Sequence, residues 1–183
     1  MDTHGRVELV TDAVVALVND HGVEALTVRR IAERVGISPS SLTSHLTSKR
    51  RIIDLTTKQI GRRLTQTIGS GLWRHRGVPA FVPDPAELEI VRAWLAMVEL
   101  SRSDAELDAA VRMVEADLGS LLDHACFTAL QPDTTALVLA VIAGLWAAAC
   151  RPDDPLPVDR ARQLLVTACD AFGVPLRDDP AAA

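Results

Sequence analysis

The stretch that most constrains the fold runs from Leu26 to Lys49 and predicts two short helices joined by a tight turn. Thr27 is suited to cap the first helix, because its hydroxyl can accept hydrogen bonds from the free N–H groups of the first turn. Four apolar residues then recur at helical spacing, namely Val28, Ile31, Ala32 and Val35. Gly36 follows directly, and a residue without a Cβ can adopt the positive φ that ends a helix and turns the chain.

The second helix of this stretch begins at Ser38, which is another capping residue. Pro39 follows at the first helical position, where its missing N–H costs nothing. Leu42 and Leu46 supply the inward face, and the outward face consists of Ser40, Ser41, Thr43, Ser44 and His45. The pattern is a helix-turn-helix, and its small polar outward face is suited to the major groove of DNA.

The DNA contacts expected from this pattern fall into two kinds. Phosphate contacts are predicted for Thr27, Arg29, His45 and Lys49, and base-edge contacts for Ser40, Ser41 and Thr43. The whole predicted surface is Thr27, Arg29, Ser38, Pro39, Ser40, Ser41, Thr43, Ser44, His45 and Lys49. The second helix has no Arg or Lys before His45, the residues that usually read guanine, so we expect modest direct readout with help from DNA shape.

These residues also carry a family resemblance. Ile31-Ala32, Val35-Gly36-Ile37-Ser38, Leu42, His45 and Ser48-Lys49, in this order and spacing, resemble the DNA-binding domain of TetR-type repressors over about residues 6–60. The resemblance implies a DNA-binding domain at 1–48 and a helical ligand-binding and dimerisation domain at 49–183. Two positions depart from the family pattern. Thr43 stands where members usually carry a Tyr that touches phosphate, and Leu46 replaces a Phe but keeps the hydrophobic plug.

The charge is unevenly distributed along the chain. Residues 1–76 carry a formal charge of +5 and residues 77–183 carry −10, within a net charge of −5. A basic N-terminal part on an acidic remainder suits a protein that presents one end to phosphate. The three cysteines match no zinc spacing and no leader precedes the first helix, so we expect a reduced, cytoplasmic protein.

The remaining periodic segments predict an all-α fold. A long helix from Ser48 to about Leu72 should link the two domains, and a loop should follow at 73–85. Gly119 suggests a kink or break near the end of the sixth helix. The other predicted helices span residues 6–20, from 84 or 85 to about 98, from 103 or 104 to about 122, 132–150 and 158–172.

The segment from Ala136 to Cys150 has no polar side chain. Fifteen residues are fewer than the ~20 that a comfortable membrane span needs, so this helix should be buried on all sides, partly by a second copy of the chain. Residues 91–96 and 143–146 resemble the C-terminal domain of BetI-type regulators, which implies a dimer built on the last two helices. The predicted interface is Val141, Leu145, Ala148, Leu164, Leu165 and Ala168.

A small-molecule effector is expected in the C-terminal domain. The candidate lining is Leu64, Trp94, Met97, Val98, Val111 and Trp146, each of which could equally be core. Tryptophan faces attract cations by ~0.5–2 kcal/mol, and Glu99 and the −10 charge would add to this attraction. A cationic amine or quaternary ammonium is therefore the first expectation, and a neutral lipophilic molecule the second.

The sequence predicts a ligand-responsive repressor that binds a palindromic operator as a homodimer. Two other classes of protein are alternatives. A small cytosolic enzyme needs converging polar groups, but His124 and Cys126 point apart on a helix and no orienting acid is evident. A helical module that only dimerises leaves the helix-turn-helix and the charge distribution unexplained. No cofactor, metal or membrane is expected.

Overall fold

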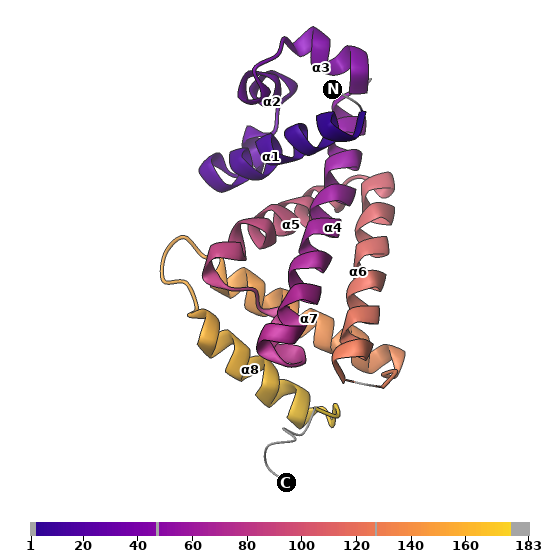
Figure 1. The fold of residues 1–183 in the computed structure, drawn as a ribbon, viewed down its shortest axis with the longest axis vertical. Helices are drawn as coiled ribbons and strands as arrows, with labels where there is room; N and C mark the ends of the chain where they lie inside the picture. The colour runs from indigo at the N-terminus through magenta and orange to yellow at the C-terminus, as the bar shows by residue number, and fades with distance from the viewer. Residues whose placement is uncertain (1–2, 47, 127, 177–183) are drawn as a thin grey trace. The chain divides into compact units, whose positions relative to one another are not determined.

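The computed structural model describes residues 3–46, 48–126 and 128–176, which form helices and turns without strands, as the all-α prediction requires (Figure 1). The chain divides into two compact units. The first unit comprises Met1–Leu64 and Glu89–Val114, and the second comprises Thr65–Leu88 and Glu115–Ala183. This division differs from a boundary at residue 48, which stays a prediction for the domain organisation.

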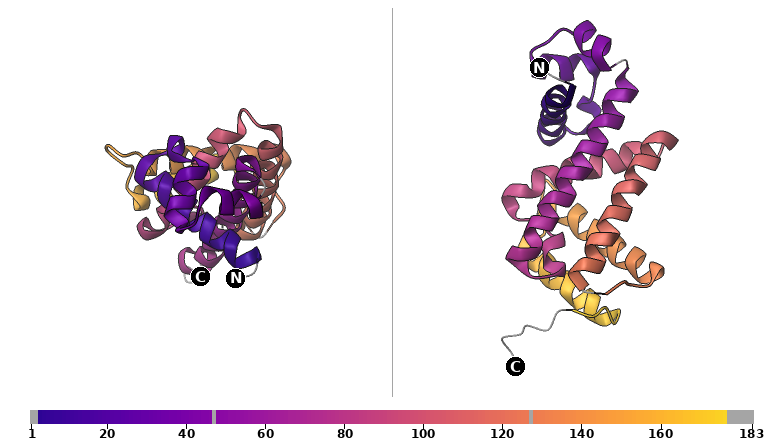
Figure 2. Two further views of the ribbon diagram at one scale, coloured as in Figure 1. Left: turned by 90° about the horizontal axis from the view of Figure 1, so that it is seen from above. Right: turned by 45° about the vertical axis from the view of Figure 1, so that its right-hand side comes forward.

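The first unit begins with the helix-turn-helix, which two further views display from other directions (Figure 2). Helix α1 spans Thr3–His21, α2 spans Val28–Val35 and α3 spans Pro39–Leu46. Thr27 caps α2 by accepting a 3.2 Å hydrogen bond from the Arg30 amide, and Gly36 ends it with a φ of 80°. Ser38 caps α3 by accepting from the Ser41 amide at 3.1 Å. The predicted caps and turn are confirmed.

Ion pairs join α1 to α4, which spans Lys49–His75. Arg63 donates to Asp12 at 2.6 Å and also to Glu8, while Arg62 donates to Glu8 at 2.9 Å. The side chains buried among α1 to α4 are mostly apolar, and the fully enclosed ones include Val14, Ile31, Leu42, Ile52 and Ile60. The start of α4 is therefore held to the helix-turn-helix by a hydrophobic core with charged pairs at its edge.

Parts of two further helices complete the first unit, namely α5, Leu88–Ser101, from Glu89 on, and α6, Ala105–Cys126, as far as Val114. Helices α4 and α6 approach closely at Gly61, which is buried. A Cβ at this position would lie 2.3 Å from Cγ2 of Val114, well inside van der Waals contact. The absence of a side chain at Gly61 is therefore what allows this helix pair to pack at its observed distance.

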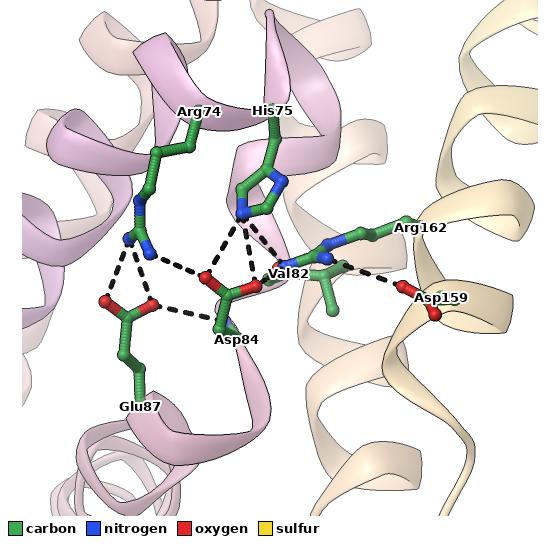
Figure 3. A network of polar contacts seen from close by, with 7 residues as sticks. All are labelled: Arg74, His75, Val82, Asp84, Glu87, Asp159 and Arg162. Atoms are coloured by element: carbon green, nitrogen blue, oxygen red, sulfur yellow. Dashed lines mark hydrogen bonds and ion pairs between the residues drawn. The ribbon is translucent and has the colours of Figure 1, made fainter.

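The second unit contains α7, Pro132–Ala149, and α8, Val158–Ala171, with 3₁₀ turns at Val78–Phe81 and Pro85–Glu87. Asp84 lies at the centre of a polar network that is drawn in Figure 3. It accepts from Arg162 of α8 at 2.6 Å and from Arg74 at the end of α4 at 2.6 Å. The network thus ties α8 and the C-terminal turn of α4 to the same loop.

Several predicted boundaries differ from the structure. Helix α4 continues through Trp73 to His75, where a loop was expected, because Arg74 and His75 find carboxylate partners at Asp84. Helix α6 passes through Gly119 without a break. A Cβ on Gly119 would lie 3.3 Å from Cγ2 of Thr135, so this glycine permits close approach to α7 and does not end its helix.

The apolar helix α7 is buried on one face only. Its buried residues are Val138, Ile142, Trp146 and Ala149, whereas Ala136, Leu137, Ala140, Ala143, Gly144 and Ala147 are exposed. The protomer therefore covers one face of this helix, as predicted. The other apolar face is uncovered in the single chain. At 18 residues, a mean hydropathy of 1.5 and 28% burial, α7 passes a length-and-composition test for a membrane span, a test that core helices of soluble proteins also pass.

Candidate DNA-binding site

The outward face of α3 carries a row of hydroxyl groups. Ser40, Ser41 and Ser44 are exposed and Thr43 is half-buried. The Thr43 hydroxyl donates back to the carbonyls of Pro39 and Ser40 at 3.0 and 3.2 Å. With its proton used inside the helix, Thr43 offers DNA a methyl group and an oxygen acceptor, which is a shorter reach than a tyrosine at this position would have.

The serines at the start of α3 also bond to one another. Ser38 Oγ lies 3.0 Å from Ser40 Oγ and 3.0 Å from Ser41 Oγ, while it caps the helix. Hydroxyl groups rotate freely and can donate and accept at once, so these bonds leave acceptor positions toward solvent. Pro39 is exposed beside them at the first turn. The described part of the predicted base-reading surface is therefore on one exposed helix face.

The cations at the start of α4 differ in how they are used. Arg50 donates to Asp104 at 2.8 Å and lies 3.4 Å from Glu106, and Arg51 donates to Asp54 at 2.8 Å. Lys49 is exposed and forms no ion pair with any residue that the structure describes. Lys49 therefore stays a predicted phosphate contact, whereas the protein itself supplies carboxylates for Arg50 and Arg51.

The Arg50–Asp104 contact shows in the electrostatics of both groups. The hydrogen bond from Arg50 holds the pKa of Asp104 below its ordinary value, and the amide of Leu107 lowers it further. The same hydrogen bond raises the pKa of Arg50. Asp104 also caps α6, since it accepts from the amides of Glu106 and Leu107 at 3.1 and 3.2 Å.

Helix α2 carries three further cations on its exposed surface, and one of them, Arg34, pairs with Asp20 at 3.0 Å. Arg29 pairs with Glu33 at 2.8 Å, with both side chains more than half exposed. Such surface pairs are worth only ~0–1 kcal/mol, so Arg29 remains able to exchange Glu33 for phosphate. Arg30 is exposed and joins no salt bridge within the described chain, so it is a candidate phosphate contact beyond those predicted from the sequence. The side chains of His45 and Leu46 lie outside the described residues.

The predicted effector-lining residues are mostly core. Leu64, Trp94, Met97 and Val111 are buried and Val98 is half-buried, all in the first unit. Trp146 belongs to the second unit, where its indole N–H donates to the carbonyl of Phe81 at 2.6 Å. This bond gives Trp146 a structural role. The convergence of these side chains on one ligand stays a prediction.

Sequence reasoning missed Thr57. Its side chain is fully buried on α4, and its hydroxyl has no hydrogen-bond partner among the described residues. A buried hydroxyl without a partner costs ~1–3 kcal/mol, so such groups commonly serve a purpose. A polar residue two turns before Leu64 on the same helix face is the signal that would have drawn attention to it.

Most of the predicted interface residues are accessible in the single chain. Val141, Leu145 and Ala148 on α7, and Leu164 and Ala168 on α8, are all half-buried. Leu165 has no exposed surface, because it points into the core of its own unit. Leu165 is therefore removed from the predicted contact face.

The described residues show neither a metal-binding group nor an activated cysteine. None of their His, Cys, Asp and Glu side chains form a group that could hold a metal ion. Burial raises the pKa of the Cys169 thiol to about 11 and also raises that of Cys126, which makes both poor nucleophiles. A capped helix-turn-helix with an exposed hydroxyl face and an uncompensated lysine defines a DNA-binding protein.

Comparison with known proteins agrees with this class. The model of the tetR family of bacterial regulatory proteins matches residues 10–56, and the model of the BetI-type transcriptional repressor C-terminal domain matches residues 75–173. The chain therefore belongs to the TetR family and carries a BetI-type C-terminal domain. Its class is that of ligand-responsive, DNA-binding transcriptional repressors, not of enzymes.

Individual relatives support the same assignment. The HTH-type transcriptional regulator BetI of Vibrio campbellii is 24% identical over 175 residues, covering 87% of this chain and 88% of the relative. A transcriptional regulator from Rhodococcus sp. superposes with a TM-score of 0.78 at 18% identity, covering 94% and 99% of the two chains. A regulator from Saccharomonospora viridis, solved in complex with choline, superposes with a TM-score of 0.74 at 16% identity over 92% and 97%.

Proposed function

We propose that this chain represses transcription from a pseudo-palindromic operator, which it binds as a homodimer in the cytoplasm and leaves when an effector binds. The observation that carries the proposal is the exposed α3 hydroxyl face, flanked by the uncompensated Lys49. A two-fold dimer would place two such helices in major grooves about one helical turn, ~34 Å, apart. Lys49, Thr27, Arg29 and His45 would hold phosphates, and Ser40, Ser41 and Thr43 would face base edges.

The dimer contact is proposed on the exposed apolar residues of α7 and α8. Small residues along α7, including Ala140, Ala143 and Gly144, would permit close approach of a second helix. A Cβ added at Gly144 would meet no described atom within 4 Å apart from its chain neighbours and the backbone of its own helix. Leu137 and Phe172 remain 45% and 40% exposed. Contiguous apolar surface of this kind commonly marks a protein interface.

The effector is proposed to be a cationic amine or quaternary ammonium compound. The BetI-type C-terminal match and the choline held by a structural relative support this class. The proposed contacts are the first-unit residues of the predicted lining, Leu64, Trp94, Met97, Val98 and Val111. The Thr57 hydroxyl on the same helix as Leu64 would gain a partner from a polar ligand. Release requires that the effector bind the DNA-free state more tightly than the DNA-bound state.

The test is an electrophoretic shift assay with the DNA upstream of the chain's own gene, repeated with choline, a polyamine and a neutral hydrophobic drug. We expect the protein to shift the upstream DNA, and an excess of unrelated DNA of equal length should not abolish this shift. Addition of a cationic compound should abolish it. A protein that binds neither DNA preferentially would overturn the repressor proposal. Release by neutral compounds alone would overturn only the proposed effector class.

Thermal-shift measurements test whether the effector contacts Trp94. A Trp94→Phe variant keeps an aromatic core residue but removes the larger indole face, so a cationic ligand should stabilise it less than it stabilises the parent chain. Trp73→Phe is the matched control, because Trp73 is 90% exposed and outside the predicted lining. Equal ligand stabilisation of the parent and Trp94→Phe would exclude Trp94 from the site.

A further inference from the structure

A cleft of about 830 Å³ lies within the first unit, and none of its lining residues belongs to the predicted effector lining. The turn at residues 23–27 forms one side, the first turns of α4 form another, and the junction of α5 with α6 closes the third. Its volume falls in the range of ~300–1,000 Å³ that small-molecule sites occupy. The cleft is therefore large enough for an organic molecule.

The charged residues of this cleft leave it negative. Carboxylates line it at Glu24, Asp54, Asp104 and Glu106, against the cations Lys49 and Arg50. Asp54 is compensated by Arg51 and Lys58, which lie outside the lining. Glu24 is exposed and has no salt bridge with another described residue. Arg50 is shared by Asp104 and Glu106, and its single positive charge cannot neutralise both carboxylates.

Apart from Thr27 and Ser103, the rest of the lining is apolar. Leu26, Ile53 and Leu107 are nearly buried, and the more accessible Val23, Leu100 and Ala105 complete an apolar wall. We propose that this cleft binds a small organic cation with an apolar body, separately from the effector site. The positive group lies against the carboxylates of Glu24 and Glu106, and the hydrocarbon part covers the apolar wall. A neutral or anionic molecule of the same shape should bind more weakly, because it is not attracted by these carboxylates.

Occupancy of the cleft is coupled to DNA. Thr27 and Lys49 both line it, and both are proposed phosphate contacts. A molecule held there takes the space through which a phosphate reaches Lys49, so the cation and DNA exclude one another. This coupling rests on the proposed function, whereas the binding of the cation does not.

Binding is tested by calorimetry and amide NMR on the DNA-free protein, with benzyltrimethylammonium as the probe and benzyl alcohol as its neutral counterpart. We expect the cation alone to bind and to shift amide signals of residues 23–27 and 103–107. The variants Glu24→Gln and Glu106→Gln should each lower the affinity about two- to fivefold, as expected for exposed charge pairs. Asp159→Asn is the control, because Asp159 is 91% exposed and does not line the cleft, and this variant should keep the parental affinity and the same shifted amides.

Equal binding of benzyl alcohol, parental affinity in both glutamine variants, or shifts confined to other residues would each overturn the proposal. Because no DNA is present, such a failure leaves the repressor proposal untouched. Conversely, a protein that fails to bind its upstream DNA can still bind the cation. A shift assay with the probe then tests the coupling, since the parent should lose DNA affinity and the Glu24→Gln, Glu106→Gln double variant should lose less.

Discussion

Arg50 in the first turn of α4 donates a 2.8 Å hydrogen bond to Asp104, the residue that caps α6. The contact brings together residues 54 positions apart in the sequence. A cation at a helix N-terminus is unfavourable, and here a carboxylate from another helix compensates it. We expect the same carboxylate to compete with DNA phosphate for the Arg50 guanidinium.

Removing the carboxylate charge should release that cation. Asp104→Asn keeps an oxygen that can cap α6 but weakens the attraction for Arg50. We expect tighter DNA binding, and a plot of log affinity against log salt that is steeper by up to ~1. Asp108→Asn is the control, because Asp108 pairs with Arg112 on the exposed side of the same helix. Equal gains in both variants would indicate a general charge effect and not release of Arg50.

Lys49→Ala should weaken the binding of every DNA sequence to the same extent and reduce the salt slope by ~1, because a phosphate contact carries no sequence information. Binding measured against an operator and several single-base variants at four salt concentrations gives both quantities. The Arg51→Ala variant, whose parent side chain is held by Asp54, should change them less. A changed base preference in Lys49→Ala would show that Lys49 reads bases.

Gly61→Ala should destabilise the fold. Its Cβ would lie 2.3 Å from a methyl of Val114, a stiff β-branched side chain, and overpacking of this kind costs ~1–3 kcal/mol. Gly69→Ala on the same helix is the control, because its nearest neighbour is 4.0 Å away. There the better helix propensity of alanine should add up to ~1 kcal/mol. Urea denaturation of both variants decides the question, and unchanged stability in Gly61→Ala would refute the close contact.

Leu145→Glu should break the proposed dimer, because an unpaired charge buried in an interface costs ~3–5 kcal/mol. Sedimentation should then show monomer or aggregate. Met113→Glu is the control, since Met113 is 64% exposed on α6 and outside the proposed contact. A stable Leu145→Glu dimer would place the interface elsewhere. Leu165→Glu cannot serve this purpose, because Leu165 is fully buried and its substitution would disrupt the protomer itself.

Asp84 should make the second unit sensitive to acid. The hydrogen bond from Arg162 lowers the pKa of Asp84 below 3.8, and His75 lowers it further. A group whose pKa is lower in the folded state stabilises the fold above its unfolded pKa, and this contribution is lost as the pH falls through the folded pKa. Asp84→Asn should therefore cost ~1–2 kcal/mol at pH 7 and progressively less below about pH 4.

Thermal denaturation of the parent and Asp84→Asn between pH 3 and pH 7 measures this difference. Asp159→Asn is the matched control, because Asp159 lies 3.5 Å from the same Arg162 but is 91% exposed. A stability difference that stays constant with pH would contradict the role of the Asp84 charge.

Local sequence determined much of this protein. Thr27, Gly36 and Ser38 act within four residues of their own positions, so capping and turn chemistry could be read directly from the chain. Helical periodicity likewise predicted the apolar faces, and the order of residues around the turn indicated the family. These features depend on backbone geometry and short-range hydrogen bonds, and both are determined by residues that are close in the sequence.

Only the tertiary structure decided which long-range partners these elements have. It gave Arg50 a carboxylate partner from another helix, kept α6 continuous through Gly119, and turned Leu165 inward while leaving one face of α7 exposed. Each outcome depends on which helix lies opposite, and hydrophobicity or charge along one helix does not specify that neighbour. Periodicity shows that a face must be covered, whereas packing decides whether the protomer or another molecule covers it.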